Sequence, residues 1–470
     1  MKSKSQNKVL FFLMICSFIL FSACKKTESQ APNFLIILID DLGSQDVGVY
    51  GQKHIQTPNI DQLARDGMRW TNAYSACPVC SPSRAAILTG KSTARVRFTG
   101  HITAIGRHRY PGNGRIIPPD DLMYLPHDEI LIPEAIRPKG YKSISIGKWH
   151  VGHEGFYPTD QGFDINIAGW THGSPPSHFF PYKSDKDWNP SIPTLQGGKS
   201  GEYLTDRLTD EAIRFMEDNQ DNPFLIYLTH YAVHTPLEAP AALIMKYERM
   251  LQGTKIDPTY AAMVESVDTN IGRLLKRMEE LGLHKNTVVI FASDNGAVEN
   301  TSDNTPFRKG KGYLYEGGIR VPFIMRWPGN IQDGSVSENL TISQDIFSTI
   351  VDIAGTGELI KHPLDGRSLV NDFKGIGTKD VDLFWYYPHY SPQAKMPGAA
   401  IRSGEFKLIQ FYDPDIVELY NLQDDIGESN NLAEEMPAKK KELLQKLKKW
   451  LDNSNTIRHK INPGYKHEDE

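Results

Sequence analysis

Short apolar runs alternate with amphipathic segments along most of the chain. Four apolar runs, rich in β-branched and aromatic residues and bounded by polar ones, predict buried strands: 34–39, 143–146, 224–228 and 288–292. Between them, apolar residues recur at helical spacing and predict helices over 58–66, 209–218 and 260–281. Such alternation is typical of an α/β fold, so we expect a large α/β sandwich with a mainly parallel sheet.

The pattern changes after about residue 375. Four short antiparallel strands are predicted over 383–387, 399–402, 407–411 and 417–422, followed by a lysine-rich helix over 438–451. A small α+β domain with an antiparallel sheet is expected there. The predicted organisation is a leader over 1–24, a polar tether over 25–33, the large domain over 34–375, the small C-terminal subdomain over 376–455 and a polar tail over 456–470.

The N-terminus carries a targeting signal. Three lysines precede the apolar run 9–21, which is too short to span a membrane, and small residues at 22–23 precede Cys24. This predicts export. The sequence around Cys24 resembles a bacterial lipobox, which implies a mature chain lipidated at Cys24 and anchored to a bilayer of the bacterial cell envelope, in the periplasm or at the outer-membrane surface. The alternative is an ordinary cleaved signal peptide with an incidental cysteine.

Bulk composition narrows the function class further. The chain has 470 residues, 39% hydrophobic and 23% charged, as in an ordinary globular protein. Its formal net charge of −5 gives no electrostatic footprint for nucleic acid, and no nucleic-acid partner is expected.

The stretch Cys80-Ser81-Pro82-Ser83-Arg84 is the strongest chemical signal. Pro82 favours a first helical turn and 85–88 are helix formers, so a helix is predicted to start just after Cys80. Cys80 then lies at the positive end of a helix dipole, and Arg84 is expected to reach back to it. Cys77 and Cys80 also form a C-x-x-C spacing, typical of redox or metal sites, but no second cysteine pair completes a zinc site.

Acidic pairs directly follow two predicted strands. Asp40 and Asp41 come after 34–39, and Asp294 and Asn295 come after 288–292. Because the carboxyl ends of parallel strands line one crevice, the two pairs can converge there. This all-oxygen set suits Ca²⁺, with Mg²⁺ as the alternative, better than zinc.

Basic and histidine side chains follow strands in the same way. Lys148 and His150 come after 143–146, and in extended backbone an i, i+2 pair points to one side. His234 follows the strand 224–228, and Lys311 lies between two glycines that allow a ligand close to the backbone. Taken singly, each of these residues could be an ordinary surface or packing residue. Because they share a position shortly after predicted strands, we expect them to belong to one site.

Taken in order, these motifs resemble the formylglycine-dependent sulfatases of the alkaline phosphatase superfamily over residues 33 to about 330. The segments 400–402 and 418–422 are similar to the small second domain of that family. The resemblance makes 34–375 the catalytic domain. It also implies that a formylglycine-generating maturation enzyme oxidises Cys80 to an aldehyde.

The resemblance also implies roles for the remaining residues. The hydrated aldehyde at Cys80, bound to the divalent cation, would attack sulfur, with Lys148 and Lys311 around the sulfate oxygens. His234 is expected to protonate the departing alcohol. His150 is expected to take the proton whose removal expels sulfate and regenerates the aldehyde.

A long Gly- and Pro-rich segment, 101–121, follows the predicted nucleophile helix. It contains His101, Arg107, Arg109 and Arg115, which we expect to bind anionic groups of the substrate; a solvated surface loop is the alternative. The leading function is therefore an exported, lipid-anchored sulfatase acting on a sulfated saccharide. The alternatives are a phosphonate or phosphodiester hydrolase of the same superfamily, a catalytically inactive glycan-binding lipoprotein and a C-x-x-C thiol oxidoreductase.

Overall fold

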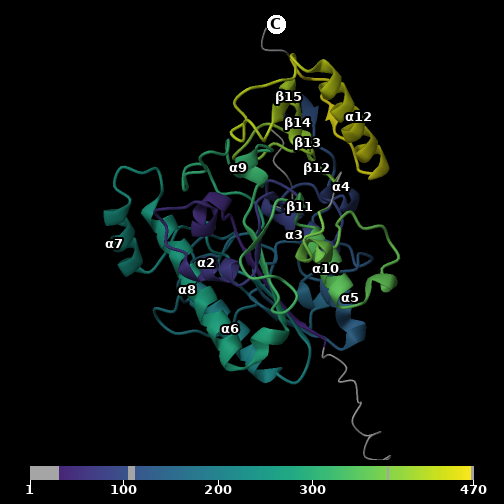
Figure 1. Cartoon of the computed structure of the whole chain (residues 1–470). Coiled ribbons are helices and arrows are strands. Elements are labelled where there is room, and N and C mark those ends of the chain that lie inside the picture. The colour runs from purple at the N-terminus through teal and green to yellow at the C-terminus, as the bar shows by residue number, and fades with distance from the viewer. Residues whose placement is uncertain (1–30, 104–111, 378–380, 467–470) are drawn as a thin grey trace, which may run out of the picture. The chain divides into compact units, whose positions relative to one another are not determined.

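A mixed, mainly parallel eight-stranded sheet forms the centre of the protein (Figure 1). The computed structural model describes residues 31–103, 112–377 and 381–466, and Pro32–Glu470 form one compact unit. Strand β9 runs antiparallel to both of its neighbours, whereas the other pairs are parallel. In sheet order the strands are β10 (Ser335–Ser337), β2 (Met68–Trp70), β9 (Phe323–Arg326), β8 (Thr287–Ser293), β1 (Asn33–Ile39), β7 (Phe224–Thr229), β5 (Lys142–Gly147) and β6 (Ile165–Ile167).

The four strands predicted from apolar runs are the central ones. They lie side by side in the order β8, β1, β7 and β5, all parallel. Every residue of β1, β7 and β8 is buried. Helices can cover both faces of a parallel sheet, which explains why these strands are continuously apolar rather than alternating. The predicted fold class is confirmed.

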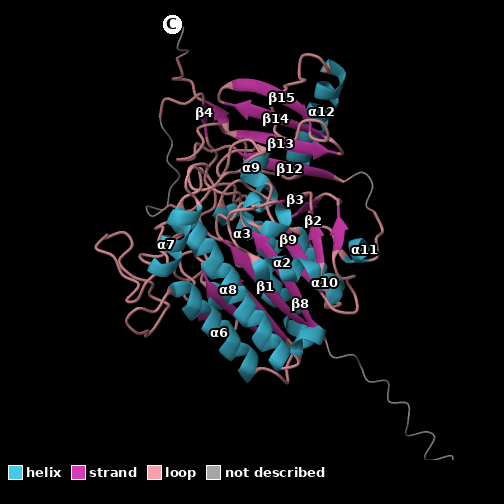
Figure 2. Ribbon diagram, turned by 60° about the vertical axis from the view of Figure 1, so that its left-hand side comes forward, coloured by secondary structure: helices cyan, strands magenta, loops and turns pink. Residues whose placement is uncertain are grey.

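One face of the sheet is covered by α2 (Pro58–Arg65), α6 (Leu204–Asp218) and α8 (Pro258–Glu280), which stand in front of it in Figure 2. The predicted helices are confirmed at these places. Helix α6 begins at Leu204 rather than at residue 209, because Leu204 and Leu208 extend its buried face.

Helices α3 (Cys80–Thr89), α5 (Ile132–Ile136) and α10 (Asp345–Ile353) lie on the other side of the sheet, where α10 contacts both others (Figure 1). In the described part of the chain, no helix is long and apolar enough to cross a membrane. The remaining elements of this region are α4 (Thr93–Val96), α7 (Ala241–Met250), α9 (Glu316–Ile319), α11 (Val370–Phe373), and the paired short strands β3 (Ala73–Tyr74) with β11 (Thr341–Ile342) and β4 (Ile116–Ile117) with β16 (Lys460–Ile461).

The C-terminal region forms the predicted antiparallel sheet, with a helix on one face. On that face Ile401 packs in one cluster with Leu447, and on the other Trp385 and Ile409 pack with Val79 of the large α/β region. Both faces are therefore buried, and the second one joins this sheet to the segment that precedes Cys80. The elements are β12 (Asp382–Tyr387), β13 (Gly398–Ser403), β14 (Phe406–Tyr412), β15 (Asp415–Asn421) and α12 (Pro437–Asn453).

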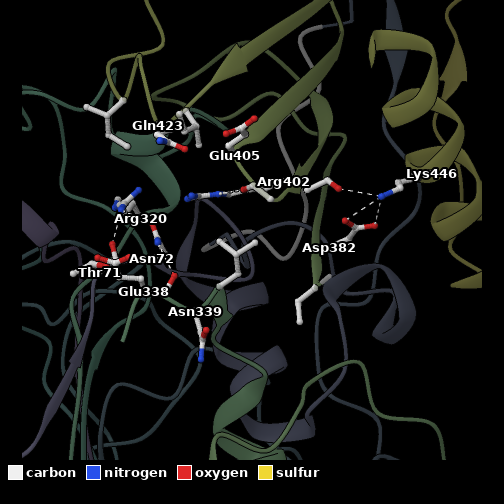
Figure 3. Close-up of a pocket in the computed structure, with 16 residues that line it drawn as sticks. Thr71, Asn72, Arg320, Glu338, Asn339, Asp382, Arg402, Glu405, Gln423 and Lys446 are labelled. Atoms are coloured by element: carbon white, nitrogen blue, oxygen red, sulfur yellow. Dashed lines mark hydrogen bonds and ion pairs between the residues drawn. The ribbon is translucent and has the colours of Figure 1, made fainter. Parts of the chain in front are cut away.

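A cavity of about 820 Å³ lies between the end of β2 and the β13–β14 turn (Figure 3). Several of its charged side chains are paired: Lys446 Nζ lies 3.0 Å from Asp382, and Arg402 Nη1 lies 4.0 Å from Glu316. Among described residues, none of the candidate site residues lines this cavity. It marks the junction of the two sheets and not the predicted reaction site.

Candidate active site and metal centre

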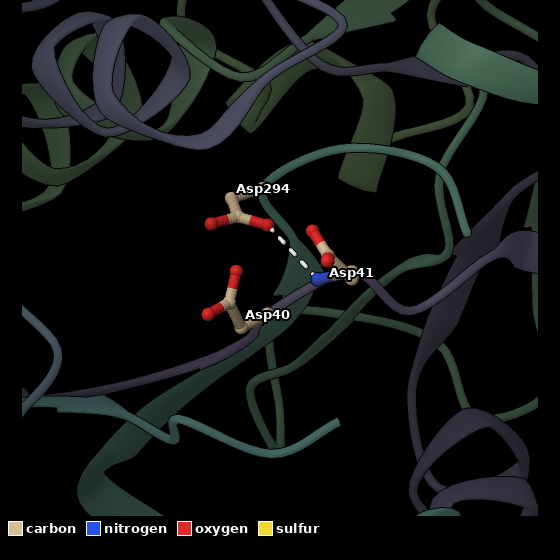
Figure 4. Close-up of side chains that lie close together, drawn as sticks. All are labelled: Asp40, Asp41 and Asp294. Atoms are coloured by element: carbon tan, nitrogen blue, oxygen red, sulfur yellow. Dashed lines mark hydrogen bonds between the residues drawn. The ribbon is translucent and has the colours of Figure 1, made fainter. Parts of the chain in front are cut away.

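The two acidic pairs converge at the carboxyl ends of β1 and β8, as predicted. In the parallel register Ile39 lies opposite Ser293, so the next residues of both strands are neighbours. One carboxylate oxygen from each of Asp40, Asp41 and Asp294 lies within 4.8 Å of the others (Figure 4). The backbone N–H of Asp41 also donates to Asp294 Oδ1 at 3.2 Å, which fixes the two loops together.

Three cationic side chains balance the three buried carboxylates. Lys148 Nζ lies 2.6 Å from Asp40 Oδ2, Lys311 Nζ lies 2.6 Å from Asp41 Oδ1, and Arg84 Nε lies 2.8 Å from Asp294 Oδ2. Burial raises the pKa of Asp40 to about 8, against the opposing effect of Lys148. Burial also acts to raise the pKa of Asp41, but Lys311 and His234 outweigh it and hold that pKa below its usual range.

The donor set fits a hard divalent cation. Besides the three carboxylates, Asn295 Oδ1 is buried without a hydrogen-bond partner, and so is Asp40 Oδ1. The Asn295 amide donates from Nδ2 to Asp41 Oδ1 at 2.8 Å, so its oxygen is the atom left for another partner. Carboxylate and amide oxygens without sulfur or imidazole favour Ca²⁺ or Mg²⁺ over zinc.

Cys80 is the first residue of α3 and is buried. Its Sγ lies 3.3 Å from Nδ1 of His150. Burial raises the pKa of the Cys80 thiol, although Lys148 and Lys311 act to lower it. Both Cys77 and Cys80 are free thiols. A thiol whose pKa is raised by burial forms little thiolate, which argues against the redox interpretation of the C-x-x-C spacing.

Arg84 does not take the place predicted for it. It was expected to reach back to Cys80, but its Nε donates to Asp294 and its Nη1 donates to the carbonyl of Lys148 at 2.7 Å. Both acceptors follow strands at the carboxyl edge of the sheet, since Asp294 comes directly after β8 and Lys148 directly after β5. Arg84 therefore ties the nucleophile helix to the acidic cluster.

Lys148 and His150 both reach the site, but not for the predicted reason. Strand β5 ends at Gly147, and His150 has a φ of +58°, so the pair is not in extended backbone. The left-handed turn at His150 directs its ring to Cys80. Its Nε2 donates to the carbonyl of Ile102 at 3.0 Å. Burial, together with Lys148, holds the pKa of His150 well below its usual value.

His234 follows β7 and faces the acidic cluster, with Nε2 3.7 Å from Asp41 Oδ2. Burial lowers its pKa to about 3, helped by Lys311 and opposed by Asp41.

Lys311 approaches the same carboxylate from the loop before α9. Gly312 has a φ of +91°, a conformation that glycine adopts easily. It brings this loop against the segment before α3, where the N–H of Gly312 donates to the carbonyl of Pro78 at 2.8 Å. The close approach predicted at this glycine is therefore to the protein's own backbone at Pro78, whereas the prediction was for a ligand.

The predicted substrate loop is only partly described. His101 precedes Ile102, whose N–H donates to Ser81 Oγ at 3.1 Å, so His101 lies near the start of α3. Arg107 and Arg109 lie outside the described residues, as does Cys24. Arg115 is bound elsewhere: it lies 2.6 Å from Asp415 in the C-terminal sheet, so it is not available for the predicted role.

A segment that the sequence analysis missed supports both histidines. The carbonyl of Trp170 accepts from the backbone N–H of His150 at 3.2 Å, and Gly173 packs directly against the His150 ring. His178 Nε2 donates to the carbonyl of His234 at 3.2 Å. The sequence analysis did not predict β6, so it had no signal that this segment follows a strand end at the same edge of the sheet.

Comparison with known proteins identifies the class that this fold and site define. The family model described as Sulfatase matches residues 32–356, and the one described as N-sulphoglucosamine sulphohydrolase, C-terminal, matches residues 308–456. The chain belongs to the sulfatase family of the alkaline phosphatase superfamily and is a sulfuric ester hydrolase.

Its relatives include sulfatases of defined carbohydrate specificity. The chain is 35% identical to N-acetylgalactosamine-6-sulfatase of Mus musculus over 76% of its length and 69% of that protein. It is 30% identical to a sulfatase of Formosa agariphila, over 96% of its length and 94% of that protein. The crystal structure of Ps i-CgsB is 28% identical, covers 93% of this chain and 95% of its own, and superposes with a TM-score of 0.75. The same enzyme is known in complex with k-i-k-neocarrahexaose.

Proposed function

We propose that this protein is an exported, calcium-dependent sulfatase that removes sulfate from a sulfated carbohydrate through a formylglycine made from Cys80. The observation that carries the proposal is the meeting of Cys80 with His150 at 3.3 Å, at the edge where the acidic cluster and two lysines also lie. The carbohydrate is supported by the relatives, which include N-acetylgalactosamine-6-sulfatases and an enzyme in complex with a neocarrahexaose.

The two missing groups fit the residues present. Asp40, Asp41, Asp294 and Asn295 would hold Ca²⁺, with Mg²⁺ as the alternative, and Cys80 would carry the aldehyde. When bound, the cation supplies positive charge that acidifies a hydroxyl and withdraws charge from sulfate oxygens, and the hydrated aldehyde supplies that hydroxyl as nucleophile.

His150 is arranged as a base. The carbonyl of Ile102 can only accept a hydrogen bond, so Nε2 of His150 carries the proton and Nδ1 presents its lone pair to Cys80. The lowered pKa of His150 keeps the ring neutral at physiological pH, which a base requires. We assign to it the proton whose removal releases sulfate.

Lys148 and Lys311 supply positive charge near Cys80. Both ammonium groups act on the thiol electrostatically, and they would attract and hold the oxygens of a sulfate ester. His234 Nδ1 donates to the carbonyl of its neighbour Thr235 at 2.9 Å, which orients Nε2 toward Asp41. We assign His234 as proton donor to the departing alcohol. Burial and Lys311 lower its pKa and outweigh Asp41, so the ring is neutral in the free enzyme and must gain the proton on Nε2 in the complex with substrate.

The N-terminal segment supports export and lipidation at Cys24, which would hold the enzyme in the bacterial cell envelope. Replacing this residue (Cys24→Ser) should move the enzyme from the membrane fraction to the soluble fraction and should block labelling by radioactive palmitate. Retention of the label in this variant would exclude the lipid anchor.

The central test follows Cys80 chemically. Protein made together with a formylglycine-generating enzyme should lack the Cys80 thiol and react with a hydrazide reagent. Cys80→Ala should be inactive, whereas Cys77→Ser, the matched control, should keep most activity. Activity should be assayed on defined sulfated saccharides, an aryl sulfate and an aryl phosphonate. A preference for the phosphonate would favour the diesterase and phosphonate alternative, and activity without the aldehyde would refute the proposal.

A further inference from the structure

Three aromatic rings stack beside the candidate active site. The rings of Trp170 and His172 are 4.2 Å apart between centroids and 3° from parallel. The ring of Trp188 continues the stack, 6.0 Å from His172 and 6° from parallel. Trp170 is buried, whereas Trp188 is 50% exposed. The stack thus runs from the core to the surface and holds the Trp188 indole in one plane.

The exposure of Trp188 is unusual for this protein. Within residues 31–103, 112–377 and 381–466 it is the one Trp, Phe or Tyr whose side chain is exposed. Lys186 Nζ lies over the ring, 5.6 Å from its centroid, and this exposed lysine side chain would have to move aside for a ligand to stack on that face. An exposed indole, braced from behind and flanked by a cation, is an arrangement that favours a ligand with an apolar face and anionic substituents.

The stack is physically continuous with the catalytic histidine. Trp170 accepts the backbone N–H of His150, and Gly173, the residue after His172, packs against the His150 ring. On the Trp188 side, Asn189 Nδ2 donates to the carbonyl of Ser174 at 3.2 Å, which ties the Trp188 loop to the same segment. One short segment, 170–174, therefore separates the exposed indole from the base.

We infer that Trp188 is a stacking platform for a sugar ring next to the sulfated one, so that the substrate is an oligosaccharide or polysaccharide and not a sulfated monosaccharide alone. The inference rests on the proposed function. The C–H groups on one face of a pyranose carry small positive charges and lie flat on the negative face of an indole. A sulfate on the stacked sugar would meet Lys186. Because the indole is already fixed by His172, little side-chain freedom is lost on binding.

The test compares substrates of different length. For Trp188→Ala, we expect KM for sulfated hexasaccharides, derived from carrageenan and from chondroitin 6-sulfate, to rise about tenfold, the loss of one aromatic stacking contact. The kcat, and all kinetics on an aryl sulfate, should stay unchanged. Trp188→Phe should recover most of the affinity. Leu359→Ala removes an equally exposed apolar side chain after α10 and serves as the matched control, for which no change is expected.

A binding assay separates this inference from the proposed function. In a Cys80→Ala background, which cannot turn over, the hexasaccharide should bind and change the tryptophan fluorescence, and the added Trp188→Ala should weaken binding and remove that change. Equal KM values for the parent and Trp188→Ala on every hexasaccharide that is cleaved would overturn the inference, and so would an equal loss on the aryl sulfate, which would indicate disturbance of His150. Absence of sulfatase activity in the formylglycine-bearing parent would instead overturn the proposed function, while hexasaccharide binding would still test the platform.

Discussion

A buried lysine joins the C-terminal sheet to helix α9, and its removal should destabilise the whole protein. Lys407 on β14 lies 2.9 Å from Glu316 at the start of α9 and 2.8 Å from Glu428, and all three side chains are fully buried. Glu316 also pairs with Arg320 at 2.7 Å, whereas Lys407 is the one ion-pair partner of Glu428 among the described residues. Lys407→Met would therefore leave Glu428 as an unpaired buried carboxylate.

The size and pH dependence of the loss follow from that geometry. Breaking a buried ion pair by removing one partner costs about 3–5 kcal/mol, and because Glu316 keeps Arg320 we expect about 3 kcal/mol near pH 8. Burial raises the pKa of Glu428 to about 7 even with Lys407 present, and without Lys407 that pKa will rise further. As the pH falls toward 6, both folded proteins take up a proton at Glu428 that the unfolded chain, with an ordinary glutamate pKa, does not, and the variant gains more from this because its Glu428 pKa is higher. Its stability relative to wild type should therefore increase as the pH falls.

Urea unfolding, followed by tryptophan fluorescence near pH 8 and pH 6, measures both effects. Lys446→Met is the matched control, because Lys446 pairs with Asp382 at 3.0 Å in the same subdomain but is 40% exposed. A surface pair of this kind is worth less than about 1 kcal/mol. Equal losses for the two lysine variants, or a loss for Lys407→Met that does not shrink toward pH 6, would refute the reasoning.

Three further predictions concern the site. Chelation should abolish activity and Ca²⁺ or Mg²⁺ should restore it, while Asp294→Ala should stay inactive with either ion; full activity of that variant after chelation would contradict the metal assignment. His234→Ala should reduce hydrolysis of a sugar sulfate far more than that of a nitrophenyl sulfate, whose leaving group needs no proton, and equal losses would exclude the acid role. His101→Ala and Arg107→Ala should each raise KM for a polysulfated or uronate-containing saccharide without affecting an aryl sulfate. For Arg107→Ala the salt dependence of binding should also weaken. An unchanged KM would show that these residues do not bind the substrate.

The sequence alone determined the four central strands of the main sheet, the helices α2, α6 and α8, and the position of the acidic cluster. Continuous apolar runs predicted the central strands because a strand buried on both faces leaves no place for polar residues. The acidic pairs could be placed at one edge because each follows its strand directly, and parallel strands end at a common edge. The position of Cys80 at a helix start was predictable from local residues in the same way.

Only the tertiary structure decided which side chains meet. Arg84 binds Asp294, which is 210 residues away in the chain, because packing brings α3 and the loop after β8 together. The left-handed turn at His150 has no local signal, since a histidine adopts it only where surrounding contacts stabilise it. The stack that ends at Trp188 depends equally on packing between separate loops. The local sequence pattern therefore specified which edge of the sheet carries the candidate active site. Long-range packing specified which side chains contact one another there, because contacts between distant residues leave no periodic pattern in the sequence.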